Sequence, residues 1–103
     1  DLDAGATGTM TSGLFPEHIG PIVVHHRNGD MDAALAQWTK CLPLINHENR
    51  QCGLRACKTV YAAGGVIGSD MVRHPLKPLS ARTKTLLLGP ACDLHLIALR
   101  LGQ

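Results

Sequence analysis

The sequence has few aromatic residues, little net charge and no long apolar run, and each shortage argues against a class of protein. Aromatic residues make up 3% of the 103 residues, so aliphatic side chains must supply nearly all of the buried surface. The formal net charge is only +2 and the ten Lys and Arg residues are scattered, which gives no support to nucleic-acid binding. No apolar run approaches the roughly 18 to 20 residues of a membrane helix. We therefore expect a soluble, cytoplasmic protein.

The cysteines and histidines lack the spacing of a metal site. The four cysteines contain no C-x-x-C pair, and nothing indicates the secreted context of a disulfide framework, so we interpret them as reduced, buried thiols. His25 and His26 are adjacent and would point about 100° apart on a helix, and the other four histidines have no ligand partner at i+3 or i+4. The sequence therefore predicts no metal and no cofactor.

Length and composition are those of one small globular unit. Apolar residues make up 45% of the chain and charged residues 17%, which is too apolar for a disordered tail. The chain opens on D-L-D-A-G, without an initiating Met or a leader. We interpret it as a segment of a longer protein.

The residue pattern predicts one short strand followed by four helices. Residues Thr9 to Ser12 alternate β-branched and other side chains between glycines, which favours a strand of about five residues. Caps, apolar periodicity and stop signals predict helices over 16–28, 30–45, 50–63 and 80–101. Pro43 is expected to kink or end the second helix, and Gly89-Pro90 to interrupt the fourth. Loops are expected over 46–49 and 66–79.

The predicted strand has no partner within this sequence. A lone strand leaves backbone donors and acceptors unpaired along both edges, which is costly if they are buried. We therefore expect the strand to join a sheet that another part of the protein supplies.

An ordered series of motifs resembles the dihydrodipicolinate synthase and N-acetylneuraminate lyase family. The segment from Gly5 to Ser12, G-A-T-G-T-M-T-S, is similar to the last barrel strand of that family. The other motifs follow in the family's order: Gly29-Asp30, Leu42-Pro43-Leu44, a helix with Lys58, a Gly-Gly turn and R-H-P-L at 73–76. The resemblance covers essentially the whole chain and is closest to the sugar-acid branch, although residues 86–103 depart from that branch at Gly89-Pro90.

The resemblance implies a fold and a set of partners. The fold class is α/β, with this chain a mostly helical C-terminal fragment of a (β/α)8 TIM barrel. Residues 1–29 would be the last βα unit and residues 30–103 a C-terminal helical domain. The implied partners are a 2-keto-3-deoxy sugar acid, the remainder of the barrel and identical subunits in a tetramer.

The resemblance also implies Schiff-base chemistry by residues upstream of this chain. In the family, a lysine on an earlier strand forms an imine with the 2-keto group of the substrate, and a tyrosine relays protons. The four lysines of this sequence, at 40, 58, 77 and 84, fall in predicted helices or a loop and none at a strand end. We therefore expect no catalytic residue here and no activity from the chain alone, and we interpret Lys58 as a support of the helical domain.

Met10, Thr11 and Ser12 are the candidate substrate-binding residues, because they fall at the carboxyl end of the predicted barrel strand. In the sialic-acid lyase branch, the serine that matches Ser12 bonds a substrate hydroxyl. In the synthase branch, the backbone at the Met10 position lines the keto-acid site. The residue types alone equally allow a local role, in which Thr11 and Ser12 satisfy backbone groups near the turn.

Two other functions remain open. The chain is also compatible with a non-catalytic helical interaction or oligomerisation module derived from the lyase tail, and with a retro-aldol sugar-acid aldolase. An upstream reading frame with a strand-borne lysine favours an enzyme, whereas a start codon at or near Asp1 favours the module.

Overall fold

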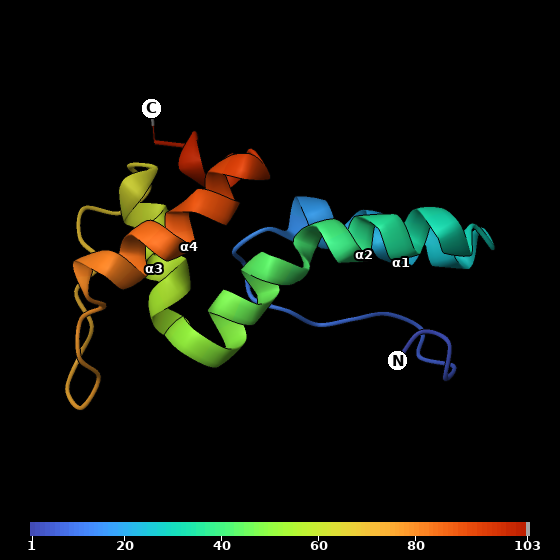
Figure 1. Cartoon of the computed structure of the whole chain (residues 1–103), viewed down its shortest axis with the longest axis horizontal. Coiled ribbons are helices and arrows are strands. Elements are labelled where there is room, and N and C mark those ends of the chain that lie inside the picture. Colours follow the sequence, from blue (N-terminus) through green and yellow to red (C-terminus); the bar gives the residue numbers. More distant parts are fainter. Residues whose placement is uncertain (103) are drawn as a thin grey trace.

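Helices dominate the computed structural model, which describes residues 1–102. After a segment without regular structure, the elements are α1 (Pro16–Arg27), α2 (Met31–Asn46), the π-helix η1 (His47–Cys52), α3 (Leu54–Ala63), α4 (Ala81–Asp93) and the 3₁₀-helix η2 (Ile97–Leu99). Helices α1 and α2 form an antiparallel hairpin at one end of the molecule, and α3 and α4 lie at the other end (Figure 1).

The hairpin turn has the local chemistry that the sequence predicts. Gly29 adopts a φ of 77°, its N–H bonds the His26 carbonyl at 3.0 Å, and the Asp30 N–H bonds the His25 carbonyl at 2.9 Å. This pair of bonds closes α1 in a Schellman motif. The Asp30 carboxylate then accepts the Ala33 N–H at 3.1 Å and caps α2. Both predicted signals, the stop at Asn28-Gly29 and the cap at Asp30, are confirmed.

The second helical pair is delimited by the predicted residues as well. Gly64-Gly65 ends α3, with Gly65 at a φ of 74° and the Val66 N–H bonded to the Tyr61 carbonyl at 2.9 Å. A loop over 66–79 follows, as expected, and the Ser80 hydroxyl accepts the Thr83 N–H at 3.1 Å to cap α4.

The strand predicted over Thr9 to Ser12 is wrong for the chain by itself. Residues 9–12 are irregular and solvent-exposed, and the side chain of Met10 is 96% exposed. The reason is physical: a strand exists only when a neighbour supplies the other half of its hydrogen bonds, and residues 1–102 include no strand that could do so.

The prolines interrupt the helices less than expected. Helix α2 passes through Pro43 to Asn46, and η1 occupies the predicted loop, so that α3 begins at Leu54 and not at residue 50. Helix α4 continues through Gly89-Pro90 and ends at Asp93, well before residue 101. Gly89 has no Cβ to clash with the proline ring that follows it.

A closed core forms where the end of α2, η1, α3 and α4 meet. Its fully buried members come from all four of these elements and from the turn that follows α4, and they include Leu44, Cys52, Ala56, Val60, Leu87, Ala91 and Leu96. Leu14 and Phe15, each 1% exposed, insert into the same core from the start of the chain. The segment that precedes α1 is therefore fixed to the α3–α4 end by its last two residues.

The α1–α2 end is open in comparison. The apolar side chains of α2 are only partly covered: Ala34, Cys41 and Leu44 are buried, but four larger side chains on the same helix are exposed, Met31, Leu35, Trp38 and Leu42. The radius of gyration is 14.7 Å, against about 13 Å for a compact domain of this length. The chain is elongated, with a large apolar helix face in solvent.

Candidate functional site

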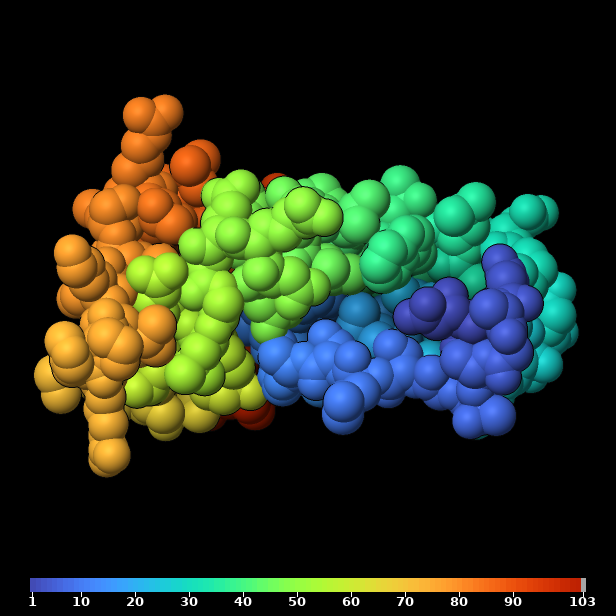
Figure 2. All heavy atoms as spheres, turned by 90° about the horizontal axis from the view of Figure 1, so that it is seen from below, coloured from blue at the N-terminus to red at the C-terminus, as the bar shows by residue number. Residues whose placement is uncertain are grey.

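The three predicted site residues lie together at the rim of a shallow groove. The groove is formed between residues 8–12 and one face of α1, to which Ile19, Gly20, Val23 and Val24 contribute. Met10, Thr11 and Ser12 are all exposed along its edge. Figure 2 shows this N-terminal segment, in blue, lying along the α1–α2 hairpin. The groove is apolar on the helix side and carries backbone and hydroxyl groups on the other.

Ser12 is hydrogen-bonded to a residue that the sequence analysis did not predict to be part of the site. Its hydroxyl donates a hydrogen bond to Oε1 of Glu48, in η1, and its Oγ accepts the Leu14 N–H at 3.2 Å. Glu48 is only 5% exposed. An acid in a polar stretch such as H-E-N-R-Q is ordinarily read as a solvated residue, so no pattern in the sequence identified this contact.

The residue after Ser12 is anchored as well. The Tyr61 hydroxyl, from α3, donates to the Gly13 carbonyl at 2.6 Å. Burial raises the pKa of Tyr61 above its usual value, so the phenol remains a protonated donor well beyond neutral pH. Together with buried Leu14 and Phe15, these contacts tie residues 12–15 to the helical end of the chain, whereas Met10 and Thr11 are exposed.

Upstream of Met10 the segment is held by exposed polar contacts with α1. The Nε2 atom of His26 lies 3.0 Å from Oδ1 of Asp3, and the Arg27 guanidinium donates to the Thr7 carbonyl at 2.7 Å. Exposed pairs of this kind contribute little to stability, on the order of 0 to 1 kcal/mol. The path of residues 1–11 is therefore much less strongly determined than that of residues 12–15.

His18 has a structural role. The Gln37 side-chain amide donates to its Nδ1 at 3.2 Å, which leaves the proton on Nε2, and that group donates to the Leu94 carbonyl at 2.7 Å. The Glu17 carboxylate beside it accepts the Ile97 N–H at 2.9 Å. These bonds join α1 to α2, to the residue that follows α4 and to η2. Over residues 1–102 no cluster of three or more His, Cys, Asp or Glu side chains is arranged to hold a metal ion.

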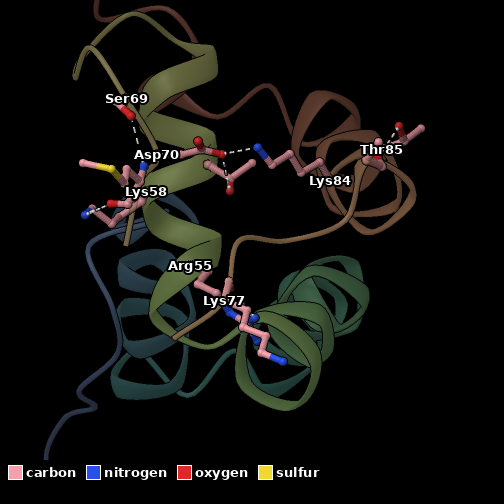
Figure 3. A network of polar contacts seen from close by, with 10 residues as sticks. Arg55, Lys58, Ser69, Asp70, Lys77, Lys84 and Thr85 are labelled. Atoms are coloured by element: carbon pink, nitrogen blue, oxygen red, sulfur yellow. Dashed lines mark hydrogen bonds and ion pairs between the residues drawn. The ribbon is translucent and has the colours of Figure 1, made fainter. Parts of the chain in front are cut away.

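Two of the four lysines fasten the loop over 66–79 to the helices (Figure 3). Lys58 donates to the Met71 carbonyl at 2.5 Å, which confirms its interpretation as a supporting residue. Lys84 lies 2.5 Å from the Asp70 carboxylate, and this hydrogen bond holds the pKa of Asp70 below its usual value. Lys40 and Lys77 are exposed. None of the four lies in the groove beside Ser12.

The expectation that the cysteines are buried thiols holds for two of them and is wrong for Cys92. Cys41 and Cys52 are buried, Cys57 is half-buried and Cys92 is exposed, and all four are free. Burial raises the pKa values of Cys41, Cys52 and Cys57, so these three stay as thiols at neutral pH. Within the part of the chain that the structure describes, no helix has the length and apolarity to cross a bilayer.

The sequence motifs and their order belong to one class of protein. The family model of the dihydrodipicolinate synthetase family matches residues 1–88, and the chain belongs to this TIM-barrel family. Among its relatives, the chain is 48% identical over 100 residues to L-2-keto-3-deoxyarabonate dehydratase of Azospirillum brasilense. The alignment covers 97% of this chain but 32% of that protein, so the chain spans about a third of the length of this relative.

Proposed function

We propose that the chain is the last barrel unit and helical domain of a Schiff-base lyase that dehydrates 2-keto-3-deoxy-L-arabonate to 2-oxoglutarate semialdehyde. The observation that carries the proposal is the 48% identity, sustained over 97% of the chain, to a protein named for the dehydration of that sugar acid. The division at residue 29, the tetramer and the barrel that completes the sheet are parts of the same proposal.

The chemistry would be shared between this chain and the rest of the protein. A lysine outside residues 1–103 forms an imine with the C2 keto group, which makes a C3 proton acidic. Loss of that proton gives an enamine, and the enamine expels the C4 hydroxyl, which a general acid protonates so that it leaves as water. Isomerisation of the resulting C3=C4 double bond moves hydrogens from C5 and its hydroxyl to C3 and C4 and gives the aldehyde, and hydrolysis of the imine releases the product and the lysine. Such a lysine must be neutral near pH 7, which requires a desolvated position inside a barrel. The exposed positions of Lys40 and Lys77 and the tethering roles of Lys58 and Lys84 are unsuited to this task.

Residues 10–12 would be this chain's contribution to the substrate pocket. The Met10 backbone would line the keto-acid end of the substrate, and the Ser12 hydroxyl would bond one of its hydroxyls. Two features support this assignment. All three residues are exposed and border one groove, and the Ser12 hydroxyl is held by a hydrogen bond to the buried Glu48.

The exposed apolar face of α2 supports the proposal that a larger structure covers it. Leu35 is 63% exposed and Trp38 is 42% exposed on a helix that is otherwise well formed. Monomeric proteins rarely leave such contiguous apolar surface in water. The remainder of the barrel or a neighbouring subunit would bury it.

The proposal is tested by the products of the full-length polypeptide. Incubated with 2-keto-3-deoxy-L-arabonate, it is expected to release 2-oxoglutarate semialdehyde and no pyruvate. Release of pyruvate with glycolaldehyde would identify a retro-aldolase instead. The isolated chain of 103 residues is expected to release none of these products. A folded full-length protein that turns over neither way would contradict the proposal.

A further inference from the structure

Glu48 is the one charged residue buried in the part of the structure that spans 1–102, and its surroundings single it out. A buried carboxylate is costly unless its oxygens are hydrogen-bonded. Its side-chain bond comes from the Ser12 hydroxyl. Glu48 also lies in a π-helix, and π-helical turns are rare and are frequently found at functional sites.

Holding the backbone in place does not explain a buried acid at this position. The Gly13 carbonyl is already bonded by Tyr61 at 2.6 Å, and Leu14 and Phe15 are each 1% exposed in the core. These contacts fix the path of the chain on the C-terminal side of Ser12 without Glu48. Glu48 instead orients the Ser12 O–H bond toward its own carboxylate, so that a carboxylate group lies against the serine hydroxyl.

We propose that Glu48 is a positioning residue that turns Ser12 into a hydrogen-bond acceptor for the substrate; this inference rests on the proposed function. A serine hydroxyl has one proton and two lone pairs. The Ser12 hydroxyl uses its proton in the hydrogen bond to Glu48, and one of its lone pairs accepts the Leu14 N–H at 3.2 Å. The remaining lone pair faces away from both and accepts a substrate O–H. The carboxylate polarises the hydroxyl and makes its oxygen a stronger acceptor.

A double-mutant cycle in the full-length enzyme separates this role from a structural one. The variants are Ser12→Ala, Glu48→Ala, their combination and Glu48→Gln, each measured for kcat, KM and melting temperature with 2-keto-3-deoxy-L-arabonate. We expect Ser12→Ala and Glu48→Ala each to lower kcat/KM by about 5- to 150-fold, because each removes a buried polar contact or its support at the substrate. The combined variant should be no worse than Ser12→Ala. Glu48→Gln keeps an acceptor oxygen and should lose less than Glu48→Ala.

The matched control is Tyr61→Phe, which removes the neighbouring anchor at Gly13 without touching the Ser12 side chain. Its effect on kcat/KM should be the same factor in the wild-type and Ser12→Ala backgrounds. If Glu48→Ala behaves like this control, the positioning role is wrong and the proposed function stands. If Ser12→Ala keeps wild-type kcat/KM, the substrate contact itself is refuted. If Glu48→Ala does not fold, Glu48→Gln measured in the same two backgrounds decides the question, since coupling predicts a loss only when Ser12 is present.

Discussion

The two ends of the chain differ in whether they contain a closed core, although both expose some apolar side chains, Leu54 and Met71 among them at the α3–α4 end. At the α3–α4 end, Val60, Leu87 and Leu96 are fully buried, and the loop over 66–79 is tied down by polar contacts. At the α1–α2 end, Leu35 and Trp38 are exposed and Met10 has almost no protein contact. The same sequence thus contains a core that closes on itself and a surface that does not.

This difference teaches which part of the chain carries its own stability. The core at the α3–α4 end is buried by residues of this chain, whereas residues 9–12 and the side chains of Met31, Leu35, Trp38 and Leu42 on α2 are exposed. Such a division fits a chain that belongs to a barrel family and spans about a third of its relative's length. The candidate site lies at the boundary, where Leu14 and Phe15 enter the closed core and Met10, Thr11 and Ser12 are exposed.

Matched leucine truncations at the two ends should give the largest contrast. Leu87→Ala, in the closed core, is expected to lower the free energy of unfolding of the 103-residue chain by about 2 to 5 kcal/mol, because it leaves a cavity. Leu35→Ala, on the open face, should cost less than about 0.5 kcal/mol. Urea unfolding measures both. In the full-length polypeptide, Leu35→Ala should become clearly more costly. Equal costs for the two variants in the isolated chain would refute the division into a closed and an open end.

Glycine substitutions sharpen the same contrast. A Cβ at Gly64 would lie 1.9 Å from the Ala98 carbonyl oxygen, so Gly64→Ala must push η2 away from α3. We expect a loss of about 1 to 3 kcal/mol in the free energy of unfolding. Gly8 has open space around it, and Gly8→Ala should change stability by less than about 0.5 kcal/mol. Thermal melts of the two variants measure these changes. An unchanged melting temperature for Gly64→Ala would show that η2 is not packed against α3 as described.

The Asp70–Lys84 pair should make the closed end sensitive to acid. The bond from Lys84 lowers the pKa of Asp70 in the folded state, so its stabilising contribution is present above the unfolded value of about 3.9 and is lost as the pH falls through the folded pKa. Melting temperatures from pH 7 to pH 2 should therefore fall less steeply for Asp70→Asn than for the wild type. Lys84→Gln removes the cause and should flatten the curve in the same way. Unchanged acid slopes in both variants would show that the pair makes no pH-dependent contribution.

The smallest expected effect is a gain at the end of α4. His95 adopts a φ of 52°, and its N–H bonds the Cys92 carbonyl at 3.0 Å, in the helix-ending position that glycine favours. His95→Gly should raise the free energy of unfolding by about 0.5 to 1 kcal/mol, because glycine has no Cβ penalty there. His95→Ala is the matched control: it keeps the Cβ and should show no gain. If the alanine variant gains as much as the glycine variant, backbone strain is not the cause.

Local signals predicted the helix ends where a side-chain cap or a glycine stop acts, and missed the start of α3 and the end of α4. The Asn28-Gly29 stop, the Asp30 and Ser80 caps and the Gly64-Gly65 stop act through neighbouring backbone groups, so the sequence alone was sufficient. Pro43 does not end its helix, which was one of the two outcomes expected, because Cys41 and Leu44 beside it are buried in tertiary packing that a window of residues does not contain.

The sequence predicted the part of the site that is contiguous in the chain and missed the part that depends on tertiary structure. Met10, Thr11 and Ser12 are contiguous, and the motif that carries the family resemblance contains all three. Glu48 lies 36 residues from Ser12 in the sequence, and its pairing with that hydroxyl depends on the course of η1. The predicted strand failed for the opposite reason, since its hydrogen-bond partners are not in residues 1–102 at all.

Borohydride trapping tests the central claim, that this chain belongs to a Schiff-base lyase whose imine-forming lysine lies outside it. The full-length polypeptide is incubated with a 2-keto acid, reduced with borohydride and mapped by peptide mass spectrometry. The account predicts one specifically labelled lysine outside residues 1–103 and no label on Lys40, Lys58, Lys77 or Lys84. Specific labelling of any of these four, or a folded and active protein that traps no substrate, would contradict it.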